Sequence, residues 1–317
     1  MSTRHWYLGI VIAALLGAAA IGMSRYQGKE GLVKEKSSKS LGASPAVVDF
    51  SVADAPINTS VFIESTQADR AWSGAMKAYA SSVSRQHPVA GIVNHHALAA
   101  DLLANFFVRL RAARPDIERF VIIAPDHFMG GRGDVSTHRR PYQTDAGLVR
   151  IDEDAVQTVL LNPLVTEERG VLFEREHGIG AIVPFVSRAY PEARIIPLAF
   201  SGKMSKDRVS ALAKVIEGLW DEKTFVLISA DMSHYLSERE AFAHDVDTLH
   251  WLKEKDIAIA QATDAFIDSG KSVAALFVAM QALHPKTTFE LFDHSVSSAY
   301  GADPLDATSY MTGVWGE

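Results

Sequence analysis

The sequence predicts an α/β fold, with a three-layer α/β/α architecture around a mainly parallel or mixed central sheet. Two observations predict this class. Short, continuous apolar runs, such as residues 120–124 and 225–230, have the length and composition of strands that are buried on both faces. These runs alternate with segments of helical spacing, and such alternation is typical of parallel sheets that are covered by helices on both faces.

The individual elements follow from the spacing of apolar residues along the chain. Segments whose apolar residues recur at helical spacing predict helices at residues 67–84, 98–110, 179–189, 206–220, 238–255 and 272–283. Short apolar and β-branched runs predict strands at residues 89–93, 120–124, 194–200, 225–230, 287–292 and 309–315. Strands and helices alternate through most of this stretch, and the last two strands close the chain.

An apolar run without any charged residue occupies residues 6–23. It has the length of a transmembrane helix, although Ala18, Ala19 and Ala20 could also serve as the cleavage site of a secretory signal. We therefore assign residues 1–23 to an N-terminal transmembrane anchor or signal segment and expect a single-pass membrane protein. Basic residues after the run favour a cytoplasmic domain. Signal-like segments, however, usually direct the export of the domain behind them, and we expect this domain on the extracytoplasmic side.

Residues 24–58 form a polar, charged stretch with few large apolar side chains, which predicts a linker. The remaining residues, 59–317, then form one α/β domain. Hydrophobic residues make up 48% of the chain, so this domain has enough apolar material for a core.

Charge and cysteine content exclude several classes of function. The net charge is -7 and no long basic block follows residue 40, which argues against nucleic acid as the main partner. The chain has no cysteine, so it has no disulfide, no thiolate metal ligand and no cysteine nucleophile.

Polar residues that can bind a metal follow three of the predicted strands. They are, in chain order, His95 with His96, Asp126 with His127, and Asp231 with His234. A fourth segment places Glu176 and His177 at the start of a predicted helix. Because the carboxyl ends of parallel strands meet at one edge of a sheet, which is where ligands bind in open α/β folds, we expect these side chains to converge.

Imidazole and carboxylate groups are the ligands of non-haem iron, zinc and copper sites. A ligating histidine usually needs a partner for its other ring nitrogen, and Asp126, Glu176 and Asp231 could supply one. Any single histidine is more often structural than functional. Because residues that can bind a metal follow three predicted strands at once, we favour a metal site. Four other histidines do not follow a strand in this way, namely His138, His244, His250 and His284.

Five segments resemble the Memo family, also called AmmeMemoRadiSam system protein B. They are GIVNHHA, IIAPDHF, EHGIGAIVPF, SADMSHY and TSYMTGVW, which occur in the family's order within residues 87–317. Three positions depart from the family's pattern: Asn94 replaces a usual proline, and Gly178 and Gly180 replace larger residues.

The resemblance implies a fold related to class III extradiol non-haem iron dioxygenases. It implies that His95 and His127 are metal ligands, and that Asp231, His234 and His177 line the same pocket. The family's cysteine position is taken here by Ser269. The neighbouring Asp268 would complete a set of two histidines and one carboxylate; alternatively, Asp268 caps the following helix or faces solvent.

Three functions remain open. The first is a dioxygenase-like oxidoreductase that uses a divalent metal, iron or copper rather than zinc, with metal ligands His95, His127 and Asp268 and with His234 or His177 as general base. The second is a metal-dependent hydrolase with Asp231 or Glu176 as base. The third is a non-catalytic module that binds a protein partner. For the enzymes, the small-molecule substrate is not specified by the sequence.

Overall fold

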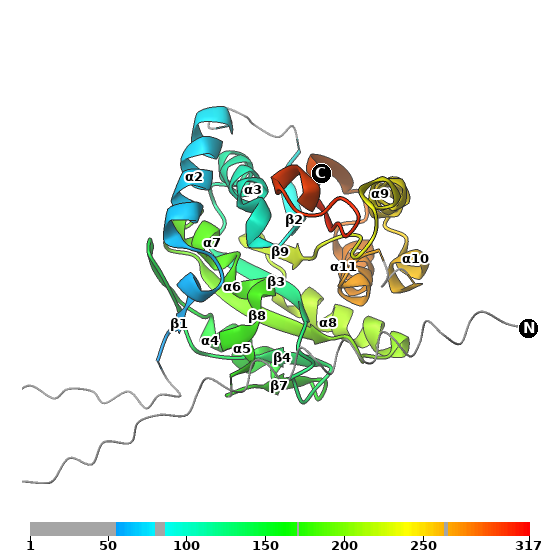
Figure 1. Ribbon diagram of the computed structural model, residues 1–317. Helices are drawn as coiled ribbons and strands as arrows, with labels where there is room; N and C mark the ends of the chain where they lie inside the picture. The colour runs from blue at the N-terminus through cyan, green and yellow to red at the C-terminus, as the bar shows by residue number, and fades with distance from the viewer. Residues whose placement is uncertain (1–54, 80–85, 170, 263–265) are drawn as a thin grey trace, which may run out of the picture. The chain divides into compact units, whose positions relative to one another are not determined.

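The structure of the protein is a computed structural model that describes residues 55–79, 86–169, 171–262 and 266–317 (Figure 1). Its centre is an eight-stranded sheet in the order β10-β11-β2-β9-β3-β8-β4-β7. The strands of this sheet are β2 (Pro88–Val93), β3 (Arg119–Asp126), β4 (Val135–Thr137), β7 (Val165–Glu167), β8 (Arg194–Ser201), β9 (Thr224–Ser229), β10 (Thr288–Val296) and β11 (Ser309–Gly316).

The four middle strands, β2, β9, β3 and β8, run parallel. On one side of them β11 and β10 run antiparallel, and on the other side β4 runs antiparallel to β8. The sheet is therefore mixed around a parallel centre. Its middle strands consist of buried, mostly apolar residues, because helices cover both faces.

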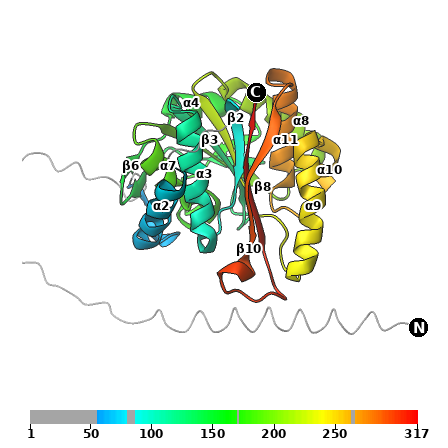
Figure 2. The ribbon, with the colours of Figure 1, turned by 90° about the horizontal axis from the view of Figure 1, so that it is seen from above.

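Two groups of helices lie on opposite sides of the sheet (Figure 2). On one side are α2 (Ser65–Tyr79), α3 (Ala100–Ala113) and α7 (Val183–Ala189). On the other side are α8 (Val209–Leu219), α9 (Glu238–Glu254), α10 (Ile257–Ala262) and α11 (Gly270–Leu283). The predicted three-layer α/β fold is confirmed.

Short elements fill the chain between these layers. A three-stranded sheet is formed by β1 (Ile57–Asn58), β5 (Tyr142–Thr144) and β6 (Gly147–Val149). The remaining α-helices are α4 (Glu153–Val159), α5 (Leu172–Arg175) and α6 (His177–Gly180). The 3-10 helices are η2 (Thr59–Val61), η3 (Ala97–Ala99), η4 (Lys206–Arg208) and η5 (Ser297–Tyr300).

The helix predicted at residues 179–189 is divided into α6 and α7. Pro184 stands in the first turn of α7, where its missing N–H costs no helical hydrogen bond. The break leaves α6 as a separate short helix, which begins at His177 with the side chain of Glu176 as its N-cap. Glu176 and His177, two candidate site residues, thus stand at the start of this short helix.

The register of the parallel strands aligns their carboxyl ends. Val93 of β2 is paired with Ser229 of β9, and Ile123 of β3 is paired with Ile228 of β9. His95, His127 and Asp231 each follow one of these strands by one or two residues. The topology therefore brings residues that are far apart in the sequence to one edge of the sheet.

The membrane predictions need correction. Among the described residues, no helix is both long enough and apolar enough to cross a bilayer. The prediction of a membrane-anchored protein, with the membrane as its location and partner, is therefore contradicted. The apolar run that suggested it, residues 6–23, lies outside the described residues. The predicted domain boundary at residue 59 stays a prediction.

Candidate metal centre

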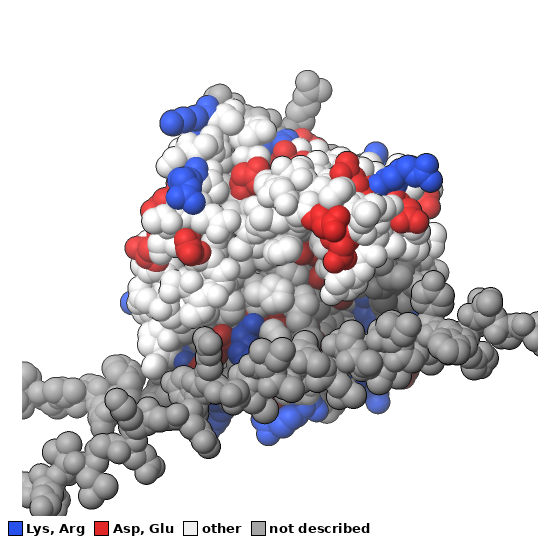
Figure 3. All heavy atoms as spheres, in the orientation of Figure 1, with Lys and Arg blue, Asp and Glu red and all other residues white. Residues whose placement is uncertain are grey.

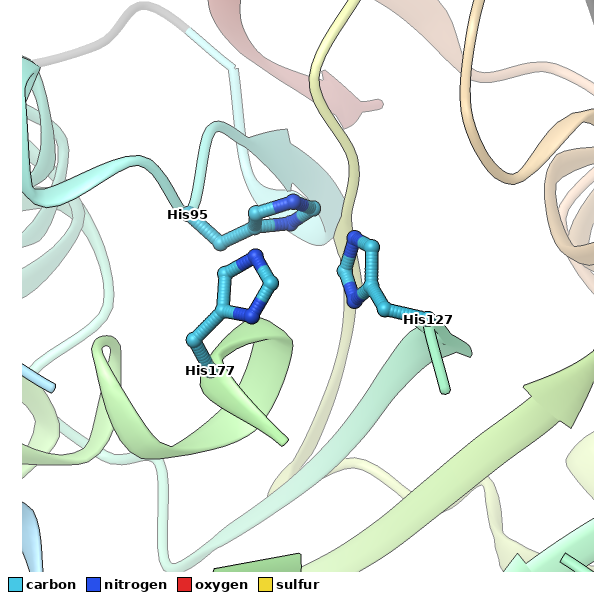
Figure 4. Close-up of side chains that lie close together, drawn as sticks. All are labelled: His95, His127 and His177. Carbon is cyan, nitrogen blue, oxygen red and sulfur yellow. The ribbon is translucent and has the colours of Figure 1, made fainter. Parts of the chain in front are cut away.

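Three histidines from three elements face one another at the carboxyl edge of the sheet (Figure 4). They are His95 after β2, His127 after β3 and His177 at the start of α6. One ring nitrogen from each lies within 4.8 Å of the others, a separation at which a single ion could be held. The ring centroids of His95 and His127 are 4.8 Å apart, and those of His127 and His177 are 4.1 Å apart.

His95 is oriented by Ser229, the last residue of β9. The hydroxyl of Ser229 donates its proton to the carbonyl oxygen of Gly178, so its oxygen is left to accept a hydrogen bond. The Nδ1 atom of His95 lies 3.0 Å from that oxygen and must therefore carry the proton. In a neutral ring, the Nε2 lone pair of His95 is then available to a metal.

Glu176 orients His127 in a similar way. Its Oε1 lies 2.7 Å from Nδ1 of His127, and its Oε2 accepts from the backbone N–H of the same residue at 2.9 Å. The carboxylate is completely buried. A carboxylate on one ring nitrogen is the usual support for a histidine that binds metal through the other. Both His95 and His127 thus present Nε2 to the site.

His177 differs from the other two histidines because it is part-exposed and makes no hydrogen bond within the described residues. Its ring stacks on His127 at an interplanar angle of 27°. Burial, together with the positive charges of His95 and His127, lowers the pKa of His177 to about 4. This imidazole is therefore neutral at neutral pH, with a lone pair that can bind a metal or accept a proton.

Asp268 joins the cluster from the segment before α11. Its Oδ2 lies 3.1 Å from Nε2 of His95 and 3.6 Å from Nε2 of His127. Its other oxygen, Oδ1, is buried without a hydrogen-bond partner in the described part of the chain. An unpartnered buried carboxylate oxygen is costly. A cation would satisfy it, so the residues fit a metal.

The charges of the cluster support each other. Burial opposes ionisation of Asp268, but the positive charge of His95 and hydrogen bonds from both histidines hold its pKa well below the usual range. Burial likewise opposes the charged form of His127, but hydrogen bonds to Asp268 and Glu176 raise its pKa to about 10. The site thus stabilises positive charge beside an ionised carboxylate, as a divalent cation requires.

The remaining predicted residues have different settings. Asp231 is buried and accepts a hydrogen bond from the backbone N–H of His95 at 3.0 Å, while its Oδ2 lies 3.7 Å from Nε2 of that histidine. Asp126 accepts from the N–H groups of Gly130 and Gly131, so it stabilises the turn after β3. His234 contacts the ring of Tyr235, and no hydrogen bond or ion pair of the described residues joins it to the three histidines.

The serine at the position of the family's cysteine makes its side-chain hydrogen bond to α11 and not to the histidines. Ser269 is buried, and its hydroxyl donates to the hydroxyl of Ser272 in the first turn of α11. The preceding residue, Asp268, carries the side chain that reaches His95. Of the two alternatives for Asp268, a helix cap or a site residue, the geometry therefore favours the site residue.

A pocket of about 480 Å³ lies beside the cluster, and His95 and His177 line it. A second pocket of about 220 Å³ is lined by His127 and Asp268. A larger cavity, of about 1060 Å³, lies at the opposite edge of the sheet around Arg119 and Arg194. The chemistry of the cluster makes the smaller pockets the relevant ones, because the large cavity contains no histidine.

Two orienting residues were missed from the sequence, namely Ser229 and Gly178. Ser229 ends an apolar strand, and a polar residue buried at a strand end was a signal that could have found it. Gly178 acts through its backbone alone: its N–H donates to Glu176 at 2.7 Å and its carbonyl accepts from Ser229. A backbone role of this kind leaves no side-chain signal.

Comparison with known proteins finds a family and several relatives that the chain resembles. Residues 76–314 match the family described as "Memo-like protein". A "MEMO1 family protein" of Caldivirga maquilingensis is 30% identical over 158 residues, which are 48% of this chain and 55% of that protein. The match thus spans about half the length of that relative. A "MEMO1 family protein" of Thermotoga maritima is 29% identical over 243 residues, or 72% of this chain and 83% of that protein.

Among solved structures, the chain is similar to an uncharacterized protein from Escherichia coli K12. The TM-score is 0.46 at 12% sequence identity, and the match covers 71% of this chain and 98% of that one.

Proposed function

Since the chain belongs to the Memo-like family, we propose that its histidine cluster is a metal centre and that the protein is a metal-dependent oxidoreductase related to extradiol dioxygenases. The observation that carries the proposal is the convergence of three histidines with Asp268, whose buried Oδ1 lacks a partner within the described residues. His95, His127 and Asp268 would form the set of two histidines and one carboxylate that is typical of non-haem iron sites.

The metal would supply redox chemistry, and iron or copper is proposed because zinc has none. The chain's own residues would position the substrate and move its proton. His177 lines the 480 Å³ pocket and is neutral at neutral pH, so we assign it the role of general base or of an additional ligand. His234 is the weaker candidate for the base, because no described contact joins it to the cluster.

Hydrogen bonding in the site favours this reaction class over hydrolysis. The two bases that a hydrolase would use, Asp231 and Glu176, are both engaged in orienting a histidine. Glu176 also accepts from the N–H of Gly178, so neither of its oxygens is without a protein partner. A carboxylate held in this way supports a ligand rather than activating a water molecule.

Elemental analysis of protein purified anaerobically without a histidine tag tests the proposal. We expect about one iron or copper ion per chain, and oxygen uptake when a substrate is supplied. Bound zinc with hydrolytic activity would instead support the hydrolase. Absence of any metal, both after purification and after incubation with iron(II), would contradict the metal centre and favour a non-catalytic module that binds a protein partner.

A further inference from the structure

The pocket beside the histidine cluster has largely apolar walls. Phe62 and Phe128 both line it, together with Val61 at its edge. Phe128 is 46% exposed, although burying an aromatic ring of this size is ordinarily favourable. At about 480 Å³, the pocket falls within the range of small-molecule sites in general. Its walls therefore suit a ligand with an apolar, flat body.

The position of Phe62 depends on a glycine in the helix that carries His177. A Cβ atom at Gly180 would lie 2.2 Å from the ring of Phe62, so any side chain at this position would displace the ring. Phe62 follows η2 and lies before the residues that match the family. The Phe62 side of the aromatic wall thus comes from outside the matched region, whereas Phe128 lies within it.

One positive charge at the pocket lacks a carboxylate partner within the described residues. Arg175 lines the pocket and stacks over Phe128, with its guanidinium carbon 4.7 Å from the ring centroid. The neighbouring acid, Glu174, is neutralised by an ion pair with Arg140. The pocket therefore combines an aromatic surface with one unpaired guanidinium group, which matches a single negative charge.

We propose that this pocket binds a small aromatic carboxylate as the substrate of the metal centre. The carboxylate pairs with Arg175, the ring lies between Phe62 and Phe128, and the opposite end of the molecule faces His177 and His95. This assignment of the substrate class rests on the proposed function, since the reacting end is the one nearest the histidines. A monoanion is favoured because one guanidinium offers one charge and a planar, two-pronged set of donors.

Binding of 3-phenylpropionate and of its neutral amide to metal-free protein tests the inference. Calorimetry should show the acid binding about fivefold more tightly than the amide, as expected for one solvent-exposed ion pair. Arg175→Gln should abolish this preference while leaving amide binding unchanged. Arg169→Gln is the matched control, because Arg169 is exposed and absent from the pocket lining; it should keep the preference.

Repeating the titrations with zinc-loaded protein separates this inference from the proposed function. If the protein takes up metal but shows no preference for the acid, or if the preference survives Arg175→Gln, the substrate class is overturned and the metal centre stands. If the preference depends on Arg175 but no metal binds, the pocket assignment stands and the metal centre fails. The metal-free arm is necessary because a carboxylate could also bind directly to zinc.

Discussion

Gly178 links the two histidines that we propose as metal ligands. Its N–H group holds Glu176, which orients His127, and its carbonyl holds Ser229, which orients His95. A Cβ atom at this position would lie 2.9 Å from Cβ of Ala124 and 3.0 Å from Oε1 of Glu176. A side chain at this position would therefore have to displace Ala124 or Glu176 from its present place.

The support that Glu176 gives to His127 can be measured through metal affinity. We predict that Glu176→Gln lowers the affinity for cobalt(II) or zinc about 10- to 100-fold, as loss of an orienting carboxylate typically does. Competition with a chromophoric chelator measures the change. Glu174→Gln is the control, because this residue is two positions away and pairs with Arg140. The metal affinity of this variant should match that of the unmodified protein. Equal affinities in all three proteins would contradict the orienting role.

We predict different effects on metal affinity for substitutions at the neighbouring residues Asp268 and Ser269. Asp268→Asn removes the charge beside His95 and His127, and we expect metal affinity to fall at least about tenfold. Ser269→Ala removes a hydroxyl that faces Ser272, and we expect affinity within about twofold of the unmodified protein. The same chelator competition measures both. A larger loss in the Ser269 variant would show that the wrong residue has been assigned to the site.

The burial of His138 should make the stability of the protein depend on pH, whether or not a metal is bound. Burial, with a smaller contribution from the charge of Arg140, lowers the pKa of this histidine to about 3. In the unfolded chain the pKa returns to about 6.5, so the unfolded state binds more protons between these values. The stability that His138 contributes is present above pH 6.5 and is lost as the pH falls toward 3.

Urea unfolding at several pH values tests this linkage. The difference in unfolding free energy between the unmodified protein and His138→Gln should shrink by about 1.4 kcal/mol per pH unit below pH 6.5. His250→Gln, at an exposed position on α9, should leave the pH profile unchanged. A difference for the His138 variant that stays constant from pH 7 to pH 4.5 would refute the account.

At the scale of elements, α3 is held to the sheet by aromatic side chains. Phe107 is fully buried, and its ring centroid lies 6.1 Å from that of Phe120 in β3 and 6.4 Å from that of Phe185 in α7. We predict that Phe107→Ala lowers the free energy of unfolding by about 3–5 kcal/mol, because the cavity lies between two layers that cannot collapse freely. Leu161→Ala, which truncates a side chain that is 78% exposed, should change it by less than about 0.5 kcal/mol. Denaturant unfolding measures both.

The long elements could be predicted from the sequence and the short ones could not. Predicted strands at residues 194–200 and 225–230 correspond to β8 and β9, because a fully buried strand needs a continuous apolar run. The strands β4, β5, β6 and β7 have three residues each, which is too short for any periodicity to appear. Their positions depend on pairing with residues far away in the chain.

At the scale of the whole molecule, topology explains how much of the candidate site could be predicted. His95, His127 and Asp231 were expected together because parallel strands place their carboxyl ends at one edge. The proximity of His177 and Asp268 depends instead on how α6 and the segment before α11 pack on that edge, which no local pattern encodes. His234 lies only three residues after Asp231, yet its ring contacts Tyr235 rather than the cluster.

The face of the molecule shown in Figure 3 offers no simple electrostatic guide to the site. On the face shown in Figure 3, acidic and basic side chains are interspersed and separated by uncharged surface. The identification of the site therefore rests on side-chain chemistry at the edge of the sheet and on the pocket beside it, rather than on charge at long range.

The metal content of three histidine variants, measured after equilibration with one equivalent of iron(II) under anaerobic conditions, tests whether the histidine cluster binds the metal. His95→Ala and His127→Ala should each retain at least about tenfold less metal than the unmodified protein, since each removes a proposed ligand. His250→Ala, an exposed histidine on α9, should retain as much as the unmodified protein. Equal retention in all three variants would contradict the account, because the metal would then be bound somewhere other than the cluster at the carboxyl edge of the sheet.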